Sequence, residues 1–250
     1  DAIWFSPIYP SPNADYGYDI SDYKDIHEDF GDLELFKKVL KEAHKRDIKV
    51  IMDLVVNHTS DEHIWFKEAR KSKDNPYRDY YIWNDEQTPN IGSIFSGSAW
   101  EFDETTNQYF FHLFSKRQPD LNWENEEVRS KIYEMINWWL DKGIDGFRMD
   151  VIELIGKKVS KGQLGDGPFL EKHLSEMYEK CFKNRDIMTV GEMGGLSVDR
   201  AQKLTSNKEK IVKNYLENEI RPYLKDDMEI RGIGLTWGIE FKDGKLARTV

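Results

Sequence analysis

The sequence has little of what disulfide-stabilised, zinc-stabilised or membrane-spanning proteins require. Cys181 is the only cysteine among 250 residues, so no intrachain disulfide can form and no Cys/His zinc spacing exists. The longest apolar runs, such as residues 49–56, are far shorter than the roughly 20 residues of a membrane helix. Packing must therefore stabilise the fold, and no membrane partner is expected.

An excess of positive charge is also missing. The 46 acidic and 36 basic residues give a net charge of −10, and both signs are mixed along the chain. Such a surface does not suit the phosphate backbone, so nucleic acid is not an expected partner. Aromatic residues, in contrast, make up 13% of the chain. They either stack against a flat ligand or fill the core.

The N-terminus carries no signal peptide, and a cytoplasmic location is expected. The chain opens at Asp1 on the apolar stretch AIWFS with no residues leading into it. We therefore expect that the start of the protein precedes this stretch.

Apolar strands and amphipathic helices alternate along the chain, which indicates a parallel sheet covered by helices. The helix that follows Asp32 should be capped by this residue, and Gly143 should end a later one. A βα barrel and a doubly wound sheet both satisfy this alternation. The predicted strands cover residues 3–8, 49–56, 144–149 and 187–190, and the predicted helices residues 33–46, 128–140 and 169–182.

Polar residues end three of these strands, where Asn57 and His58, Arg148 and Asp150, and Glu192 occur. Several strands that direct reactive groups to one rim are typical of a barrel. Residues 58–122 break the alternation and are too long for a simple loop. We interpret them as a small inserted subdomain that overhangs this rim.

Arg148 and Asp150 lie two apart on a strand, so their side chains share a face. The guanidinium is expected to keep Asp150 ionised, as a carboxylate nucleophile requires, although a structural ion pair is the alternative. Glu192 ends the next strand. Retaining glycosidases use two catalytic carboxyl groups that lie roughly 5 to 5.5 Å apart. Asp53 should accept hydrogen bonds, and His58 either contacts a sugar hydroxyl or is satisfied within the protein.

Five ordered motifs resemble the α-amylase superfamily, glycoside hydrolase family 13, and most of all oligo-1,6-glucosidases and bacterial α-glucosidases. The resemblance covers residues 1–205 and implies a partial (β/α)8 TIM barrel, strands two to five, with a subdomain after the third strand. It divides the chain into barrel (1–58), inserted subdomain (59–122), barrel (123–205) and a tail (206–250). The motifs are DYGYDISDY at 15–23, DLVVNHTS at 53–60, QPDLNW at 118–123, GFRMDV at 146–151 and VGEM at 190–193.

By this resemblance Asp150 is the nucleophile and Glu192 the general acid/base of a hydrolase that cleaves terminal glucose from small oligosaccharides. No cofactor and no metal are implied, because the family's metal loop precedes the matched region. Val151 matches enzymes that prefer α-1,6 over α-1,4 bonds. The remaining matches are Arg148, which holds the nucleophile, His58, Asp15 and Tyr18, which bind the terminal glucose, and Phe95, Phe114 and Gln118, which line the neighbouring subsite.

The pattern also departs from the family. The third catalytic aspartate, expected after Glu192, is absent, and from Ile211 the sequence changes. Residues 215–220 and 230–240 resemble the C-terminal part of class III (diaminobutyrate) aminotransferases, without their cofactor-binding lysine. We expect the 250-residue chain to be inactive by itself. Alternatives are a sucrose isomerase or other transglycosylase, and a non-catalytic relative.

Overall fold

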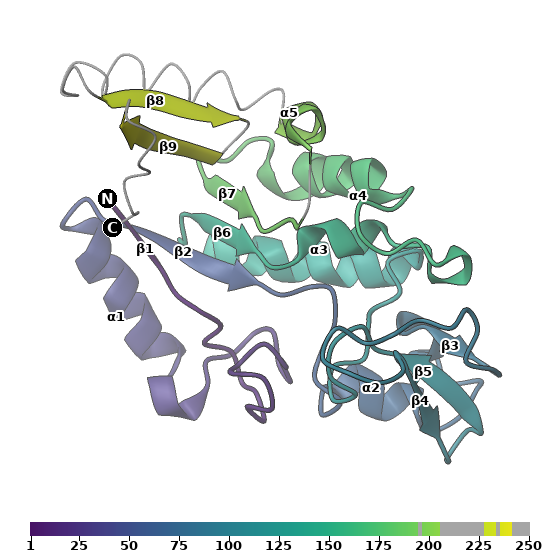
Figure 1. Cartoon of the computed structure of the whole chain (residues 1–250). Helices are drawn as coiled ribbons and strands as arrows, with labels where there is room; N and C mark the ends of the chain where they lie inside the picture. Colours follow the sequence, from purple (N-terminus) through teal and green to yellow (C-terminus); the bar gives the residue numbers. More distant parts are fainter. Residues whose placement is uncertain (195–196, 206–227, 234–235, 242–250) are drawn as a thin grey trace. The chain divides into compact units, whose positions relative to one another are not determined.

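The computed structural model describes residues 1–194, 197–205, 228–233 and 236–241 (Figure 1). The chain divides into two compact units, Asp1–Met193 and Gly194–Val250. In the second unit the structure describes α5 (Val198–Thr205) and an antiparallel pair, β8 (Met228–Ile233) and β9 (Thr236–Phe241). Residues 215–220 of the aminotransferase-like tail lie outside the described residues, as do 234 and 235.

The first unit is built on a parallel sheet with the order β1-β2-β6-β7 (Figure 1). Its strands are β1 (Ala2–Trp4), β2 (Lys49–Leu54), β6 (Gly146–Met149) and β7 (Met188–Gly191). Helices α1 (Leu33–His44), α3 (Glu126–Asp141) and α4 (Leu170–Met177) alternate with them. Every neighbouring pair of strands is parallel, which confirms the α/β class that the sequence predicted.

Local side-chain contacts explain where the helices begin and end. Asp32 accepts a hydrogen bond from the Leu35 N–H, 2.7 Å away, and so caps α1 as predicted. Asn125 caps α3 in the same way. Gly143 follows α3 with φ +98°, the left-handed conformation that favours glycine. The third predicted helix is not uniform, because α4 passes into the π-helical turn η5 (Tyr178–Phe182).

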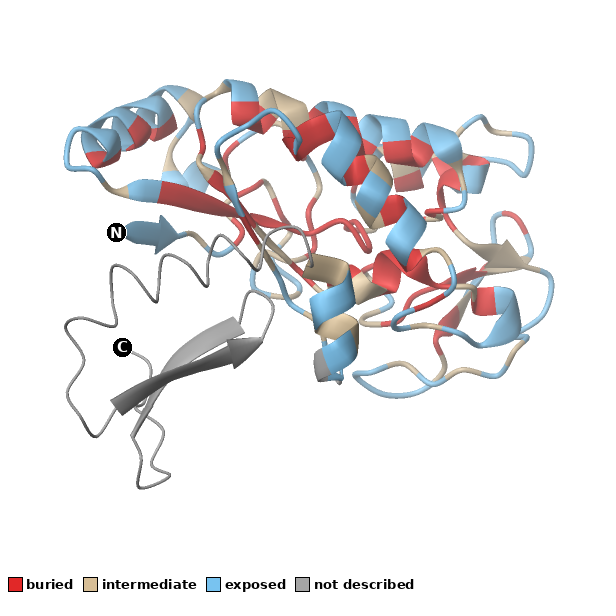
Figure 2. Cartoon of the chain, turned by 90° about the horizontal axis from the view of Figure 1, so that it is seen from above, coloured by how far each residue is buried: buried red, intermediate tan, exposed pale blue. Residues whose placement is uncertain are grey.

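The first two strands differ in burial. Residues 50–54 of β2 are buried, whereas Ile3 is 43% and Trp4 50% exposed on β1 (Figure 2). The prediction of a buried first strand was therefore wrong. The sequence shows that a segment is apolar but not how many neighbours it has, and β1 pairs within the described residues with β2 alone.

An antiparallel sheet of order β3-β5-β4 lies between β2 and α3 in the chain (Figure 1). Aromatic rings fill this region; those of Phe66 and Phe110 are 5.0 Å apart, and those of Trp100 and Phe111 are 5.1 Å apart. Many aromatics of the sequence thus serve as core. Its elements are α2 (Ile64–Ala69), η2 (Arg78–Tyr80), β3 (Trp83–Asn84), β4 (Trp100–Asp103) and β5 (Gln108–Phe111).

Three short 3-10 helices complete the first unit: η1 (Glu28–Phe30), η3 (Ile152–Gly156) and η4 (Val159–Lys161). None of the helices in the described ranges is long and apolar enough to cross a membrane.

Candidate active site

Strand register brings the predicted reactive groups to one edge of the sheet. Asp53 of β2 lies opposite Arg148 of β6, and Arg148 lies opposite Val190 of β7. Gly146 allows this close pairing, since a Cβ at this position would lie 1.8 Å from the Met188 carbonyl oxygen. The ends of three parallel strands thus deliver Asp53, Arg148 with Asp150, and Glu192.

One guanidinium connects three carboxylates, and we call these four residues, Asp53, Arg148, Asp150 and Glu192, the Arg148 cluster. The Arg148 Nη1 group donates to both Asp53 carboxylate oxygens at 3.0 Å and to Asp150 Oδ1 at 2.8 Å. The Nη2 group donates to Glu192 Oε2. The Tyr18 hydroxyl donates to Asp53 Oδ2 at 3.3 Å. The cluster holds the proposed nucleophile and acid/base on one cation.

Burial dominates the electrostatics of the two inner carboxyl groups. It raises the pKa of Asp150 to about 7 and the pKa of Asp53 to about 6, and Arg148 offsets only part of this effect. Arg148 favours the ionised form of Asp150, as expected, but burial outweighs this effect and the net shift of the pKa is upward. The sequence shows the neighbouring cation but not the loss of solvent, and Arg148 is shared among three carboxylates.

Glu192 is fixed through both its backbone and its side chain. Its N–H donates to the Met149 carbonyl at 2.9 Å, and its own carbonyl accepts from the Ile152 N–H at 3.1 Å. The Val151 N–H donates to Glu192 Oε2 at 3.3 Å. Val151 adopts φ +35°, which a β-branched residue rarely does. Backbone strain is thus located directly after Asp150, at the residue whose N–H contacts Glu192.

Val151 also has an apolar environment. It packs against a cluster of buried residues that combines the antiparallel sheet with the segment after β6. The Val151 side chain, which the resemblance connects with linkage preference, therefore packs against a cluster to which both the antiparallel sheet and the segment after β6 contribute. The cluster comprises Ala99, Trp100, Phe111, Leu113, Leu154 and Val159.

A second group of predicted residues surrounds a buried histidine, and we call Asp15, His58, Phe114 and Gln118 the His58 cluster. Gln118 Nε2 donates to Asp15 Oδ2 at 2.9 Å and lies 3.1 Å from His58 Nε2. Burial lowers the pKa of His58, which favours the neutral ring. The ring centre of Phe114 is 5.2 Å from that of His58 and 5.7 Å from that of the exposed Phe95.

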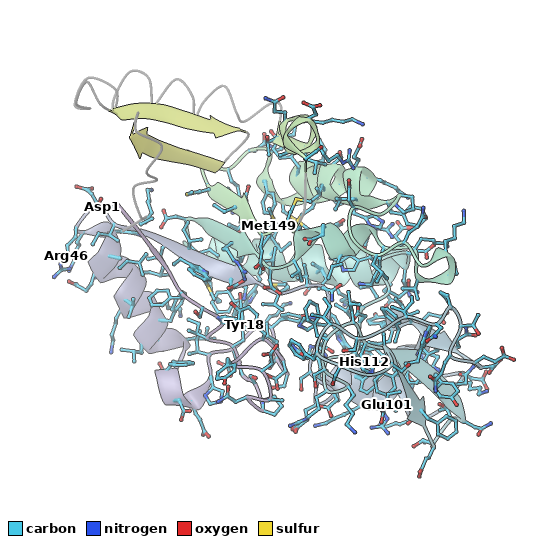
Figure 3. All side chains as sticks on the ribbon, in the orientation of Figure 1. Asp1, Tyr18, Arg46, Glu101, His112 and Met149 are labelled. Carbon is cyan, nitrogen blue, oxygen red and sulfur yellow. The ribbon has the colours of Figure 1, made fainter. Side chains whose placement is uncertain are left out.

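The loop that carries Asp15 and Tyr18 (Figure 3 labels Tyr18) is organised by Asp19, which the sequence analysis did not single out. The buried Asp19 carboxylate accepts hydrogen bonds from Ser11 Oγ and from the N–H groups of Ala14 and Asp15, at 2.9 to 3.0 Å. Asp19 lies within the motif at 15–23, so the motif itself contained the signal.

Sequence reasoning also missed Trp4 and Lys157. The Trp4 side chain donates a hydrogen bond to Asp53, and the Arg148 guanidinium lies 5.4 Å from its ring centre. The buried Lys157 donates to Asn57 Oδ1 at 2.5 Å and pairs with Asp120 at 3.0 Å. Asn57 and Asp120 belong to recognised motifs, but no pattern in the sequence marked Lys157. Over the described ranges no three His, Cys, Asp or Glu side chains are placed to hold a metal ion.

Comparison with known proteins agrees with this geometry. Residues 1–219 match the family described as alpha amylase, catalytic domain. The chain belongs to this family. It is 56% identical over 216 residues to an oligo-1,6-glucosidase of Parageobacillus thermoglucosidasius, a match that covers 79% of the chain and 38% of the relative. It is 57% identical over 202 residues to a glucan 1,6-alpha-glucosidase of Streptococcus pneumoniae, covering 80% of the chain and 37% of the relative.

Solved structures give the same fold. A trehalose-6-phosphate hydrolase of Bacillus licheniformis matches with a TM-score of 0.77 and 52% identity, over 81% of this chain and 39% of that one. A trehalulose synthase variant in complex with sucrose matches with a TM-score of 0.76 and 41% identity, over 82% and 40%. The chain spans about two fifths of the length of these relatives. This confirms a partial α-amylase-type α/β barrel fold with an antiparallel insert.

Proposed function

We propose that the chain supplies the nucleophile and the acid/base of a retaining α-glucosidase that cleaves terminal α-1,6-linked glucose from short oligosaccharides. The observation that carries this proposal is the Arg148 cluster. It connects Asp150 and Glu192, at the ends of neighbouring parallel strands, to one guanidinium. In this proposal residues 1–58 and 123–205 form the barrel part, and residues 59–122 the inserted subdomain.

The geometry suits a two-step displacement. The Asp150 carboxylate attacks the anomeric carbon while the Glu192 carboxyl group donates its proton to the departing glycosidic oxygen. Water then attacks the anomeric carbon of the glucosyl ester, the bond to Asp150 breaks and releases its carboxylate, and Glu192 takes the proton from this water. Glu192 has the exposure for this role, because its side chain is 50% exposed whereas that of Asp150 is 10% exposed.

A positive charge develops on the sugar ring in the transition state, and it favours the ionised form of Asp150 when substrate is bound. The buried Asp53 shares Arg148 with Asp150, so it contributes to keeping the guanidinium in place. Asp53 is proposed as a positioning residue rather than a reacting one.

The His58 cluster is proposed to bind the terminal glucose. Neutral His58, Asp15 and Gln118 present donors and acceptors suited to sugar hydroxyls, and Tyr18 offers an aromatic face next to Asp53. The exposed Phe95 and its neighbour Phe114 are proposed to contact the next sugar unit. Val151 is proposed to favour α-1,6 bonds, consistent with relatives described as oligo-1,6-glucosidases.

The second candidate is a transglycosylase or isomerase, in which another sugar replaces water. The trehalulose synthase at 41% identity supports it, but the oligo-1,6-glucosidases at 53 to 56% identity favour hydrolysis. The two differ in what accepts the glucosyl group, so the products distinguish them.

The experiment measures glucose release from isomaltose, maltose and sucrose. It uses the 250-residue chain and a chimera in which residues 1–205 replace the matching part of the Bacillus cereus oligo-1,6-glucosidase. We expect the chimera to hydrolyse isomaltose fastest. Isomerised disaccharides from sucrose would favour the second candidate. A folded chimera that is inert towards all three sugars would overturn the proposal.

A further inference from the structure

A cavity of about 480 Å³ lies away from the Arg148 cluster, between the antiparallel insert and the segments that flank α3 and η3. On the insert side it is lined by residues that include Lys73, Arg78 and Trp83. On the other side Trp123 and Lys158 contribute to its wall. Its volume is within the range of small-molecule sites. None of the residues proposed to act on substrate lines it.

Arg78 is the unusual group in this cavity wall. It is only 5% exposed, and it forms no ion pair with any carboxylate in the described part of the chain. Its Nη groups donate to the Ala69 carbonyl, to Thr106 Oγ1 and to Gln108 Oε1, but its buried Nε has no hydrogen-bond partner. Asp103 and Asp79 act on Arg78 electrostatically without forming an ion pair with it. An anion in direct contact would further offset the cost of burying this cation.

The other cations of the lining are paired with carboxylates. Lys158 pairs with Glu124 at 2.5 Å, Lys157 pairs with Asp120 at 3.0 Å, and Lys73 lies 3.6 Å from Asp85. Arg78 is therefore the one lining cation that forms no ion pair in the described part of the chain.

Aromatic side chains and amides complete the wall. Tyr81, Trp83 and Trp123 line the cavity together with Asn122 and Gln108. The Arg78 guanidinium lies 3.2 Å from the centre of the Trp83 ring, which fixes both groups. Apolar ring surface next to amide donors and acceptors suits a sugar, and the volume exceeds what a bare phosphate ion would fill.

We propose that this cavity binds a small anionic sugar, a hexose that carries a phosphate or carboxylate group, with the anionic group at Arg78 and Lys158. The site is separate from the Arg148 cluster and does not depend on the proposed glucosidase activity. Lys157, at the cavity wall, connects the cavity with the His58 cluster, because it donates to Asn57, whose side chain lies 3.1 Å from His58 Nδ1.

Isothermal titration of the purified 250-residue chain tests the proposal with three probes: glucose 6-phosphate, glucose and inorganic phosphate. We expect saturable binding of glucose 6-phosphate that is at least about tenfold tighter than binding of either other probe. Equal affinity for glucose would overturn the role of the anionic group. Equal affinity for inorganic phosphate would overturn the role of the sugar, and the absence of saturable binding would overturn the site.

Matched variants locate the binding. Ser160→Trp places a large ring at the exposed edge of the cavity and should abolish binding, whereas Ser130→Trp on the exposed face of α3 should leave it unchanged. Lys158→Met should weaken binding about tenfold, and Lys161→Met, outside the cavity, should not. Asp150→Asn should bind as the parent does. Equal binding by the Ser160→Trp and Ser130→Trp proteins would place the ligand elsewhere and refute the proposal.

Discussion

The Arg148 cluster and the His58 cluster each contain buried residues of the candidate site, but they differ in charge and in backbone support. The Arg148 cluster joins three carboxylates to one cation, and its members lie at the ends of β2, β6 and β7. In the His58 cluster, a neutral histidine and an amide meet one carboxylate, all on segments between regular elements. The carboxylates of the Arg148 cluster are thus placed by strand register, and the members of the His58 cluster by loops.

This difference predicts two kinds of mutational effect. Changes in the Arg148 cluster alter the charge balance and should act on the chemical step. Changes in the His58 cluster remove single hydrogen bonds and should act on substrate binding.

Asp150→Asn should remove nearly all turnover of the chimera, with little effect on its folding. The amide cannot form the glucosyl ester, and losing a nucleophile ordinarily costs several orders of magnitude in kcat. Steady-state kinetics with isomaltose and circular dichroism provide the two measurements. A variant that keeps more than about a hundredth of the parent kcat would exclude the covalent role of Asp150.

The Arg148 cluster was largely predictable from the sequence. Arg148 and Glu192 lie at the ends of apolar strands and Asp53 lies within another, and parallel strands direct their C-terminal ends to one rim. The sequence could not show that Arg148 is shared by three carboxylates or that burial raises the pKa of Asp150. Both depend on how tightly the surrounding chain excludes water.

The His58 cluster was predictable only through the family motifs. No local pattern brings Asp15 within hydrogen-bond distance of Gln118, because 103 residues separate them. The positive φ of Val151 and the ion pair between Lys157 and Asp120 are likewise products of tertiary packing. Propensity also failed for β1, whose apolar residues are exposed because exposure depends on neighbouring strands.

His58→Ala should lower kcat/KM of the chimera by about tenfold to a hundredfold, mainly through KM. The substitution removes one hydrogen-bonding ring and leaves Gln118 Nε2 with Asp15 as its remaining partner. His63→Ala is the matched control, because His63 is also buried but caps α2. If His58→Ala instead reduced kcat alone, the assignment of this cluster to binding would be wrong.

Asp150 should also make stability depend on pH. Its pKa rises from an ordinary value of 3.8 to about 7 in the folded chain, so the folded state binds more protons between these values. Its contribution to stability therefore falls as pH rises through this window. Asp150→Asn imitates the neutral acid, so its stability relative to the parent should rise between pH 4 and 8 by on the order of 2 kcal/mol.

Asp145→Asn provides a control of opposite sign. Burial opposes the effect, but hydrogen bonds from the Val50 N–H, His44 and Lys49 lower the pKa of Asp145. Asp145 thus contributes stability above its unfolded pKa, which is lost as pH falls through the folded value, so Asp145→Asn should be most destabilising at high pH. Urea unfolding at several pH values measures both series. Parallel curves for the two variants would contradict the electrostatic difference between the sites.

The smallest effect concerns Val151, the strained residue that follows Asp150 and contacts Glu192. At φ +35°, Val151→Gly should be about 1 kcal/mol more stable than Val151→Ala, because both lose the side-chain contacts but only glycine relieves the backbone. At Val39, inside α1, the order should reverse, since glycine is unfavourable within helices. In the chimera, Val151→Ala should also change the ratio of the kcat/KM values for isomaltose and maltose. The change should correspond to a difference in transition-state stabilisation of roughly 1 to 3 kcal/mol. If the Ala variant were more stable than the Gly variant at position 151, as expected at position 39, Val151 would not be strained. An unchanged ratio of the kcat/KM values for isomaltose and maltose would contradict the role of Val151 in linkage preference.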